Sequence, residues 1–436
     1  MMGTGQDLYI RAKQIIPGGT QLLSKRPEMF LPDQWPAYYT RAKGSEVWDL
    51  EGRRFIDCSI GGVSACPLGY ADPDVEEAVV GAVKAGSMST LNCPEEVELA
   101  ELLLDIHEWA DMVRYARSGG EIMAVAARIA RAATGRTKIA FCGYHGWHDW
   151  YLAANLGKGD ELDSHLLAGL DPAGVPAGLQ GTMLPFEYNR LDQLEQIVGG
   201  NQDIAAIVME PVRYLPPAKG FLEGVRKVAD QVGAVLVFDE ITSGWKMNVG
   251  GIHLTYGVNP DLAIYAKAIA NGHAMAAVVG RESVMSAAQA TFISSTNWTE
   301  RIGPAAALAT IRKLEALAVP ASLIETGNMI REGWLSAASR AGLELSVGNI
   351  PPLSTFSLNY ENALAIITLF NQEMLDRGFL ATSQFVPTLA HTEAQIACYF
   401  EAVDEIFPML VDAIENKKVE VKLRGPIKHS GFERLN

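Results

Sequence analysis

Apolar and polar positions alternate along this chain with two different periods, and the changes of period predict its strands and helices. Residues 46–58 alternate on either side of Glu51-Gly52, which predicts a β-hairpin with a glycine turn. In 73–85 and 94–106 the apolar residues return every three or four positions, and each run opens with a proline suited to the first helical turn. We therefore expect a small sheet followed by two helices.

The middle of the chain alternates short, wholly apolar runs with amphipathic stretches. This pattern is typical of a mostly parallel sheet covered by helices on both faces. The predicted strands are 138–141, 204–209, 234–238, 262–265 and 276–279. Near residues 310–317 a long helix leads out of this region, and the remainder reads as helices and strands of a smaller α+β lobe.

These elements predict an α/β fold with a large and a small domain. Residues 1–60 would form an N-terminal arm and part of the small domain. Residues 61–317 would form the large domain, and residues 318–436 the rest of the small domain with a peripheral tail. A chain of 436 residues is long enough for two such cores.

Composition and charge exclude several classes of function. The chain is 48% hydrophobic and 20% charged, as globular proteins are. Its net charge of −15 provides no basic stripe for nucleic acid and no attraction to anionic membranes. Five scattered cysteines without a CxxC pair predict neither a disulfide framework nor a zinc site. Without a visible export signal or a membrane-spanning run, we expect a cytoplasmic protein.

Two predicted strands end in residues that carry chemistry. The apolar run 234–238 ends at Asp239, and the run 262–265 is followed by Lys267. In an open α/β sheet the carboxyl ends of parallel strands meet at the ligand crevice. Taken alone, Asp239 is more simply a helix cap or loop acid, and Lys267 a solvated surface lysine.

Together these two residues meet the chemical needs of pyridoxal phosphate (PLP). The cofactor requires a lysine that forms an imine with its aldehyde, and an acid that keeps its pyridine nitrogen protonated. Apolar surroundings lower the pKa of a lysine and make its amine a nucleophile near neutral pH. The pairing therefore favours PLP chemistry with Lys267 and Asp239 as catalytic residues.

Further groups suit this cofactor. Ser118, Gly119 and Gly120 precede a helical stretch, whose free N-terminal amides attract an anion such as phosphate, although a plain loop before a helix has the same look. After residues 138–141, Tyr144 could stack on a pyridine ring. His145 lies beside it and His148 follows; with no third ligand at a recognisable spacing, packing and hydrogen bonding are favoured and no metal site is predicted.

In order and spacing these motifs resemble the class III (ω-type) aminotransferases of PLP fold type I, in particular the branch of glutamate-1-semialdehyde aminomutase. The likeness runs from about residue 16 to residue 407. Its marks are Pro17-Gly18-Gly19, Val47-Trp48-Asp49 with Gly52 and Ile56-Asp57, Leu68-Gly69-Tyr70, residues 98–102, Ser118 to Glu121, Tyr144-His145-Gly146, Glu210-Pro211, Phe238-Asp239-Glu240, residues 257–261 and Lys267. The fold implied has a mostly parallel, seven-stranded sheet between helices in its large domain.

The resemblance implies a role for each matching position. Lys267 would be the aldimine lysine and proton shuttle, and Asp239 the partner of the pyridine nitrogen. The remaining cofactor-binding residues would be Ile241 and Tyr144 on the two ring faces, His145 beside them, Ser118, Gly119 and Gly120 at the phosphate, and Glu210 near the ring hydroxyl. A threonine of a neighbouring subunit completes the phosphate site in this family. Ser295-Thr296 matches that stretch, so a homodimer with shared active sites is implied.

The chain also departs from the family pattern. The aminomutase has Ser-Gly-Thr where this chain has Ser118-Gly119-Gly120, so one phosphate-binding hydroxyl is missing and Ser118 or water must compensate. Lys25 or Arg26 could replace the arginine that binds the substrate's carboxylate. The segment after Thr296 diverges, and its residues Trp298 and Glu300 are candidates for substrate contacts.

The favoured function is an aminotransferase that works by a ping-pong mechanism in two half-reactions. An amino donor gives its nitrogen to the cofactor, and a polar aldehyde or ketone acceptor, for example a sugar-like one, takes it up. The first alternative is an intramolecular aminomutase that uses the same residues. Others are a catalytically silent PLP-fold protein and a dinucleotide-dependent oxidoreductase, the latter disfavoured because no GxGxxG follows a strand.

Overall fold

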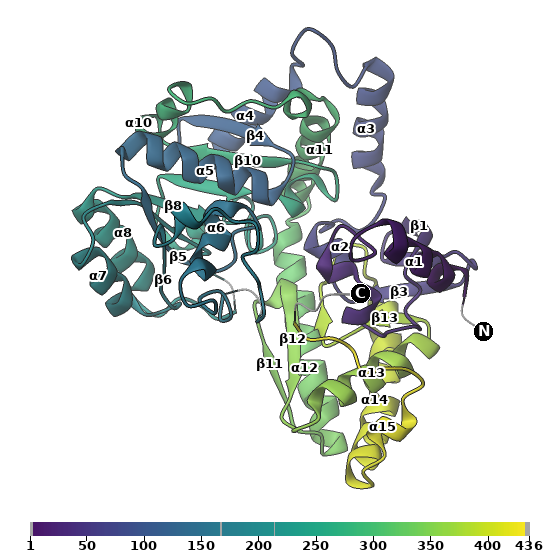
Figure 1. Cartoon of the computed structure of the whole chain (residues 1–436). Coiled ribbons are helices and arrows are strands. Elements are labelled where there is room, and N and C mark those ends of the chain that lie inside the picture. The colour runs from purple at the N-terminus through teal and green to yellow at the C-terminus, as the bar shows by residue number, and fades with distance from the viewer. Residues whose placement is uncertain (1–2, 166–167, 213, 432–436) are drawn as a thin grey trace. The chain divides into compact units, whose positions relative to one another are not determined.

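The structure is a computed structural model that describes residues 3–165, 168–212 and 214–431. The chain forms two compact units (Figure 1). One unit comprises Met1–Asp72 and Ser322–Asn436, and the other comprises Pro73–Ala321. The domain boundaries expected from the sequence, after residues 60 and 317, and the functional naming of the domains stay predictions.

Unit Pro73–Ala321 is built on a seven-stranded sheet in the order β4-β10-β9-β8-β7-β5-β6. The pairs within β9-β8-β7-β5-β6 are parallel, whereas β10 runs antiparallel to both β4 and β9. The strands are β4 (Met112–Ala116), β5 (Lys138–Cys142), β6 (Met183–Pro185), β7 (Ile204–Met209), β8 (Val235–Asp239), β9 (Leu262–Tyr265) and β10 (Ala276–Gly280). The mostly parallel, seven-stranded sheet expected for the large domain is therefore confirmed.

Helices cover both faces of this sheet. Successive residues of β8 point to opposite sides: Val235 and Val237 pack in the same cluster as residues of α5, while Leu236 and Phe238 pack with residues of α7 and α8. This explains why β8 reads as a wholly apolar run rather than an alternating one. The helices of the unit are α3 (Pro73–Ala85), α4 (Glu95–Ile106), α5 (Gly119–Thr134), α6 (Asp149–Leu152), α7 (Leu191–Gly199), α8 (Phe221–Val232), α9 (His253–Tyr256), α10 (Glu282–Met285) and α11 (Ile302–Ala316).

The hydrophobic pattern predicted most of these elements. The two early helices correspond to α3 and α4, and the five predicted strands correspond to β5, β7, β8, β9 and β10. Strands β4 and β6 were not predicted. The first has polar residues at two of its five positions, and the second is only three residues long, so neither gives an apolar run.

The other unit combines the two ends of the chain. The predicted hairpin is present, since β2 pairs antiparallel with β3. Its two sheets have the orders β1-β2-β3-β13 and β11-β12-β14. The strands are β1 (Tyr39–Lys43), β2 (Glu46–Asp49), β3 (Arg54–Cys58), β11 (Leu345–Gly348), β12 (Ser354–Leu358), β13 (Phe379–Ala381) and β14 (Gln384–Phe385), and its helices include α1 (Thr4–Ile15), α2 (Gly61–Ser64), α13 (Ala363–Asp376), α14 (Glu393–Glu415) and α15 (Val419–Lys422). Helix α12 (Val319–Ala341) begins at the boundary.

Within the described part of the chain, no helix combines the length and the apolar character needed to cross a membrane.

Candidate active site

The carboxyl ends of β8 and β9 bring Asp239 and Lys267 to the same edge of the sheet. The two strands are parallel neighbours, and Asp239 itself pairs with Ile264 of β9. Lys267 opens a short 3₁₀ helix, Lys267–Ala270, with a φ of 49°. A left-handed backbone is costly for a residue with a side chain and is concentrated at functional sites. The Nζ atom of Lys267 donates to Oγ1 of Thr242, at 3.4 Å.

Hydrogen bonds hold the buried carboxylate of Asp239 in one orientation. Its Oδ1 accepts from the backbone N–H of Ile241 at 3.0 Å, and its Oδ2 lies 2.8 Å from Nδ1 of His145. The other ring nitrogen of His145 lies 3.2 Å from the carbonyl oxygen of Cys142. Both ring nitrogens of His145 therefore face oxygen atoms, which fixes the imidazole between the ends of β5 and β8 and orients the Asp239 carboxylate. The hydrogen-bonding role expected of His145 is thus present in the structure.

The adjacent acid, Glu240, belongs to a separate and wholly buried network. Its Oε1 accepts from the backbone N–H and the Nδ1 of His253, each at 2.9 Å, and its Oε2 accepts from the Ser243 hydroxyl. Trp109 donates to the other nitrogen of that ring at 3.1 Å. Burial alone would raise the pKa of Glu240, but the hydrogen bonds from His253 and Ser243 outweigh it and hold the pKa below its ordinary value. This network joins Glu240, at the end of β8, to Ser243 and to His253 of α9.

A buried lysine, Lys246, lies within electrostatic range of Lys267. Burial holds the pKa of Lys246 well below its ordinary value, the positive charge of Lys267 lowers it further, and Glu240 opposes both effects. The side chain of Lys246 is 1% exposed. Lys246 was not predicted from the sequence, although its position shortly after Asp239-Glu240 could have indicated it.

The glycine pair of the predicted phosphate site forms the first turn of α5. A Cβ atom built on Gly119 would lie 3.1 Å from Cδ1 of Ile241 and 3.9 Å from Cβ of Ala266. This turn therefore lies directly against the segments that carry Asp239 and Lys267. The free N–H groups at the start of a 16-residue helix, in a cradle that a Cβ would partly fill, fit the phosphate of PLP.

The predicted ring-binding residues Tyr144 and Ile241 pack, partly buried, against one hydrophobic cluster. The backbone N–H of Tyr144 donates to Oε2 of Glu210 at 3.2 Å, which connects the ends of β5 and β7. The structure thus brings together in one unit Asp239, Lys267, Ser118, Gly119, Gly120, Tyr144, His145, Glu210 and Ile241.

The predicted substrate residues are placed differently. Glu300 accepts from the Arg117 side chain at 3.1 Å and from the N–H groups of Ile302 and Gly303 at the start of α11, and Trp298 donates to Glu121 at 3.4 Å. These contacts favour a structural function for both. Lys25 and Arg26 lie in the other compact unit, where Lys25 is exposed and Arg26 packs against Gly18.

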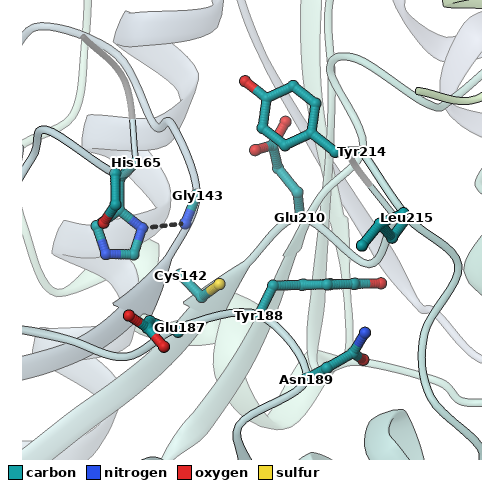
Figure 2. A pocket seen from close by; sticks show the side chains of 10 residues that line it. Cys142, Gly143, His165, Glu187, Tyr188, Asn189, Glu210, Tyr214 and Leu215 are labelled. Carbon is teal, nitrogen blue, oxygen red and sulfur yellow. Dashed lines mark hydrogen bonds between the residues drawn. The ribbon is translucent and has the colours of Figure 1, made fainter. Parts of the chain in front are cut away.

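A cavity of about 230 Å³ lies at the carboxyl ends of β5, β6 and β7 (Figure 2). It shares Glu210 and Gly143 with the surroundings of Tyr144. His165 accepts from the backbone N–H of Gly143 at 3.2 Å. The lining residues are Cys142, Gly143, Ser164, His165, Glu187, Tyr188, Asn189, Glu210, Tyr214 and Leu215. Sequence reasoning missed this cavity, because its wall is formed by four separate segments of the chain. Across the described ranges, no group of His, Cys, Asp or Glu side chains is arranged to hold a metal ion.

A family model, individual protein sequences and solved structures all match this chain. The family model described as aminotransferase class III matches residues 32–406. The chain is 35% identical over 325 residues to the 3-aminobutyryl-CoA aminotransferase of Cloacimonas acidaminovorans (strain Evry), which covers 72% of this chain and 73% of the relative. It is 33% identical over 431 residues to the glutamate-1-semialdehyde 2,1-aminomutase of Desulforamulus reducens, covering 92% and 97%. Among solved structures, the PLP internal aldimine form of the FumI protein of Sphingopyxis sp. MTA144 superposes with a TM-score of 0.85 at 26% identity, covering 95% of this chain and 98% of that one.

Proposed function

The chain belongs to the class III aminotransferases, enzymes that use PLP, and on this premise we propose that it moves an amino group between two separate small molecules by a ping-pong mechanism. The observation that supports this most directly is the geometry of the two strand ends. The segments that carry Lys267 and Asp239 lie against the glycine cradle at the start of α5, through Ala266 and Ile241. When bound there, PLP supplies an electron sink that stabilises negative charge at the substrate's Cα.

We assign the work of the protein to its own side chains. Lys267 holds the cofactor and moves a proton at the substrate's Cα, with Thr242 as a hydrogen-bond partner of its amine. Asp239, oriented by His145, keeps the pyridine nitrogen protonated. Tyr144 and Ile241 confine the ring from its two faces, and Glu210 lies beside Tyr144 near the ring hydroxyl.

The residues that line the cavity at the ends of β5, β6 and β7 favour a polar molecule as the amino acceptor. Carboxylates of Glu187 and Glu210, the amide of Asn189 and the hydroxyl of Tyr214 surround it (Figure 2). Such groups can pair with the hydroxyls of a polar, sugar-like aldehyde or ketone. The cavity is now the basis of this proposal, because Trp298 and Glu300 already have protein partners.

Donor dependence distinguishes transfer from internal rearrangement, which the similarity to an aminomutase keeps open as the second candidate. With a ¹⁵N-labelled amino donor and a panel of carbonyl acceptors, we expect label to appear in the acceptor's product, as measured by mass spectrometry. Without the donor we expect no turnover. Turnover of a single amino aldehyde that needs no donor and retains its own nitrogen would instead establish the aminomutase.

We also propose that the enzyme is a homodimer whose subunits share active sites. Ser295 and Thr296 are exposed in the single chain. Leu91 and Phe292, in the same unit, are 81% and 85% exposed, which is unusual for large apolar side chains and suits burial against a second copy. All five cysteines are free, in keeping with a reducing location such as the cytoplasm.

A complementation experiment tests the shared sites. Lys267→Ala and Thr296→Ala chains, each impaired alone, are expected to recover activity when refolded together, because one site of the mixed dimer then has both wild-type residues. Light scattering should give twice the chain mass of 47.1 kDa. A monomer, or a mixture no more active than its components, contradicts the proposal.

A further inference from the structure

The turn that follows β5 folds back onto the first turn of α5. A Cβ atom built on Gly146 would lie 3.0 Å from Cα of Gly120. A Cβ on Gly120 would in turn lie 3.0 Å from both Cε1 and Nδ1 of His148, and 3.4 Å from Cδ1 of Trp147. Glycine at both positions allows this approach. The imidazole of His148 therefore occupies the space that a side chain at position 120 would take.

The imidazole of His148 carries an unpaired nitrogen in this place. Among the described residues, Nδ1 of His148 is buried and has no hydrogen-bond partner. The ring of Trp147 stacks on the imidazole, with centroids 4.4 Å apart and an angle of 28° between planes, and so restricts its orientation. Buried polar atoms in native proteins are almost always paired, so an unpaired one beside a ligand cradle indicates a ligand atom as its partner.

Ser118 is not free to take over the missing contact. Its hydroxyl donates to Oε2 of Glu121 at 3.1 Å, and the same carboxylate oxygen accepts from the backbone N–H groups of Ser118 and Arg117. The hydrogen of the Ser118 hydroxyl therefore points to a carboxylate. Of the two substitutes expected for the absent threonine hydroxyl, Ser118 or water, Ser118 is thus already engaged by the protein.

We propose that His148 donates a hydrogen bond from Nδ1 to the phosphate of PLP, in the place of the threonine that the aminomutase pattern has where this chain has Gly120. The inference rests on the proposed site at Lys267. It explains together the glycine at position 120, the close approach of the two turns and the unpaired nitrogen. On this view His148 replaces the missing threonine as a phosphate ligand, so the number of phosphate ligands is unchanged.

The charges around His148 are compatible with this role. Burial lowers the pKa of His148, while Glu121 on α5 and Asp149 on α6 oppose that shift. The ring is therefore neutral near neutral pH before the cofactor binds, and its Nδ1 can carry the single proton. A phosphate dianion beside the ring would favour the protonated form, so uptake of a proton on PLP binding is a further expected result.

The test measures cofactor affinity of the full-length apo-protein by fluorescence titration. His148→Ala and His148→Phe, which keeps the stacked ring, are expected to weaken PLP binding by roughly 10–100-fold, the range for one hydrogen bond to a charged group. Pyridoxal, which has no phosphate, should bind both variants as it binds the wild type. Gly120→Thr alone should also weaken PLP binding, because its side chain overlaps His148.

A double variant provides the sharpest comparison. His148→Ala with Gly120→Thr should recover most of the PLP affinity, because the threonine then has both the space and the hydroxyl. His148→Ala with Gly120→Ala, which fills the space without a hydroxyl, should not recover it. Unchanged PLP affinity in both His148 variants, or an equal loss for pyridoxal, would overturn the inference. Failure of the underlying function is recognised separately, because wild-type protein would then carry no PLP on Lys267 after borohydride reduction.

Discussion

Replacement of Lys267 by alanine is expected to abolish covalent attachment of PLP and to lower kcat by at least roughly 10⁴-fold, the upper range for loss of a general acid–base group. Lys267 is the amine at the end of β9, held 3.4 Å from Thr242 and beside the glycine cradle of α5. Its removal takes away both the covalent anchor and the base that acts on the substrate's Cα. The phosphate contacts remain, so PLP should still bind noncovalently.

The measurement is reduction of the wild-type holoenzyme with borohydride, followed by peptide mapping. A pyridoxyl group is expected on Lys267 and is expected to be absent from Lys267→Ala. Lys246 provides an internal control, because it is a nearby lysine whose pKa is lowered by burial. An adduct on Lys246 of the wild type would show that the wrong lysine has been assigned. Circular dichroism of the variant separates loss of attachment from loss of folding.

The sequence was sufficient to predict the architecture wherever apolar runs were complete. Strands β8 and β9 are buried on both faces, so every position in 235–238 and 262–265 is apolar and the strands are visible in the pattern. Strand β4 carries Arg114 and Tyr115 and is only partly buried along four of its five positions, so it gives no such signal. The antiparallel direction of β10 was also invisible, because direction is set by the connections rather than by local composition.

The residues of the candidate site likewise fall into those that the sequence could predict and those that it could not. Asp239, Lys267 and the glycine pair could be found from the sequence, because strand ends and helix starts fix where such side chains go. The family assignment read from their order is confirmed by the match over residues 32–406. The functional roles of the individual residues stay predictions.

Contacts between distant loops could not be found in this way. The approach of His148 to Gly120 depends on how the turn after β5 folds back, and no local pattern encodes it. For the same reason the ion pair between Glu300 and Arg117 could not be foreseen from the sequence. Residues that act through tertiary proximity therefore needed the structure.

The second large effect is expected from Asp239→Asn, which removes one negative charge with little change in shape. The carboxylate lies between His145 and the backbone N–H of Ile241, and both contacts require acceptor oxygens. An amide there cannot hold a proton on the pyridine nitrogen, so the electron sink is weakened. We expect kcat to fall by roughly 10²–10³-fold, as for loss of one preorganised electrostatic group. PLP should still attach to Lys267.

Glu240→Gln is the matched control, because it removes the neighbouring buried charge from a network that faces His253 and Ser243 instead. It should lower the free energy of unfolding by about 1–3 kcal/mol, as for an impaired buried hydrogen bond, with a smaller effect on kcat. Steady-state kinetics and denaturant unfolding of both variants distinguish the two roles. If Asp239→Asn retains wild-type turnover, or if Glu240→Gln is the more severe kinetic lesion, then the acid that faces the pyridine nitrogen has been misassigned. The contacts of the two acids make the opposite result the physically expected one. His145 orients the carboxylate of Asp239, whereas both oxygens of Glu240 are already occupied by His253 and Ser243.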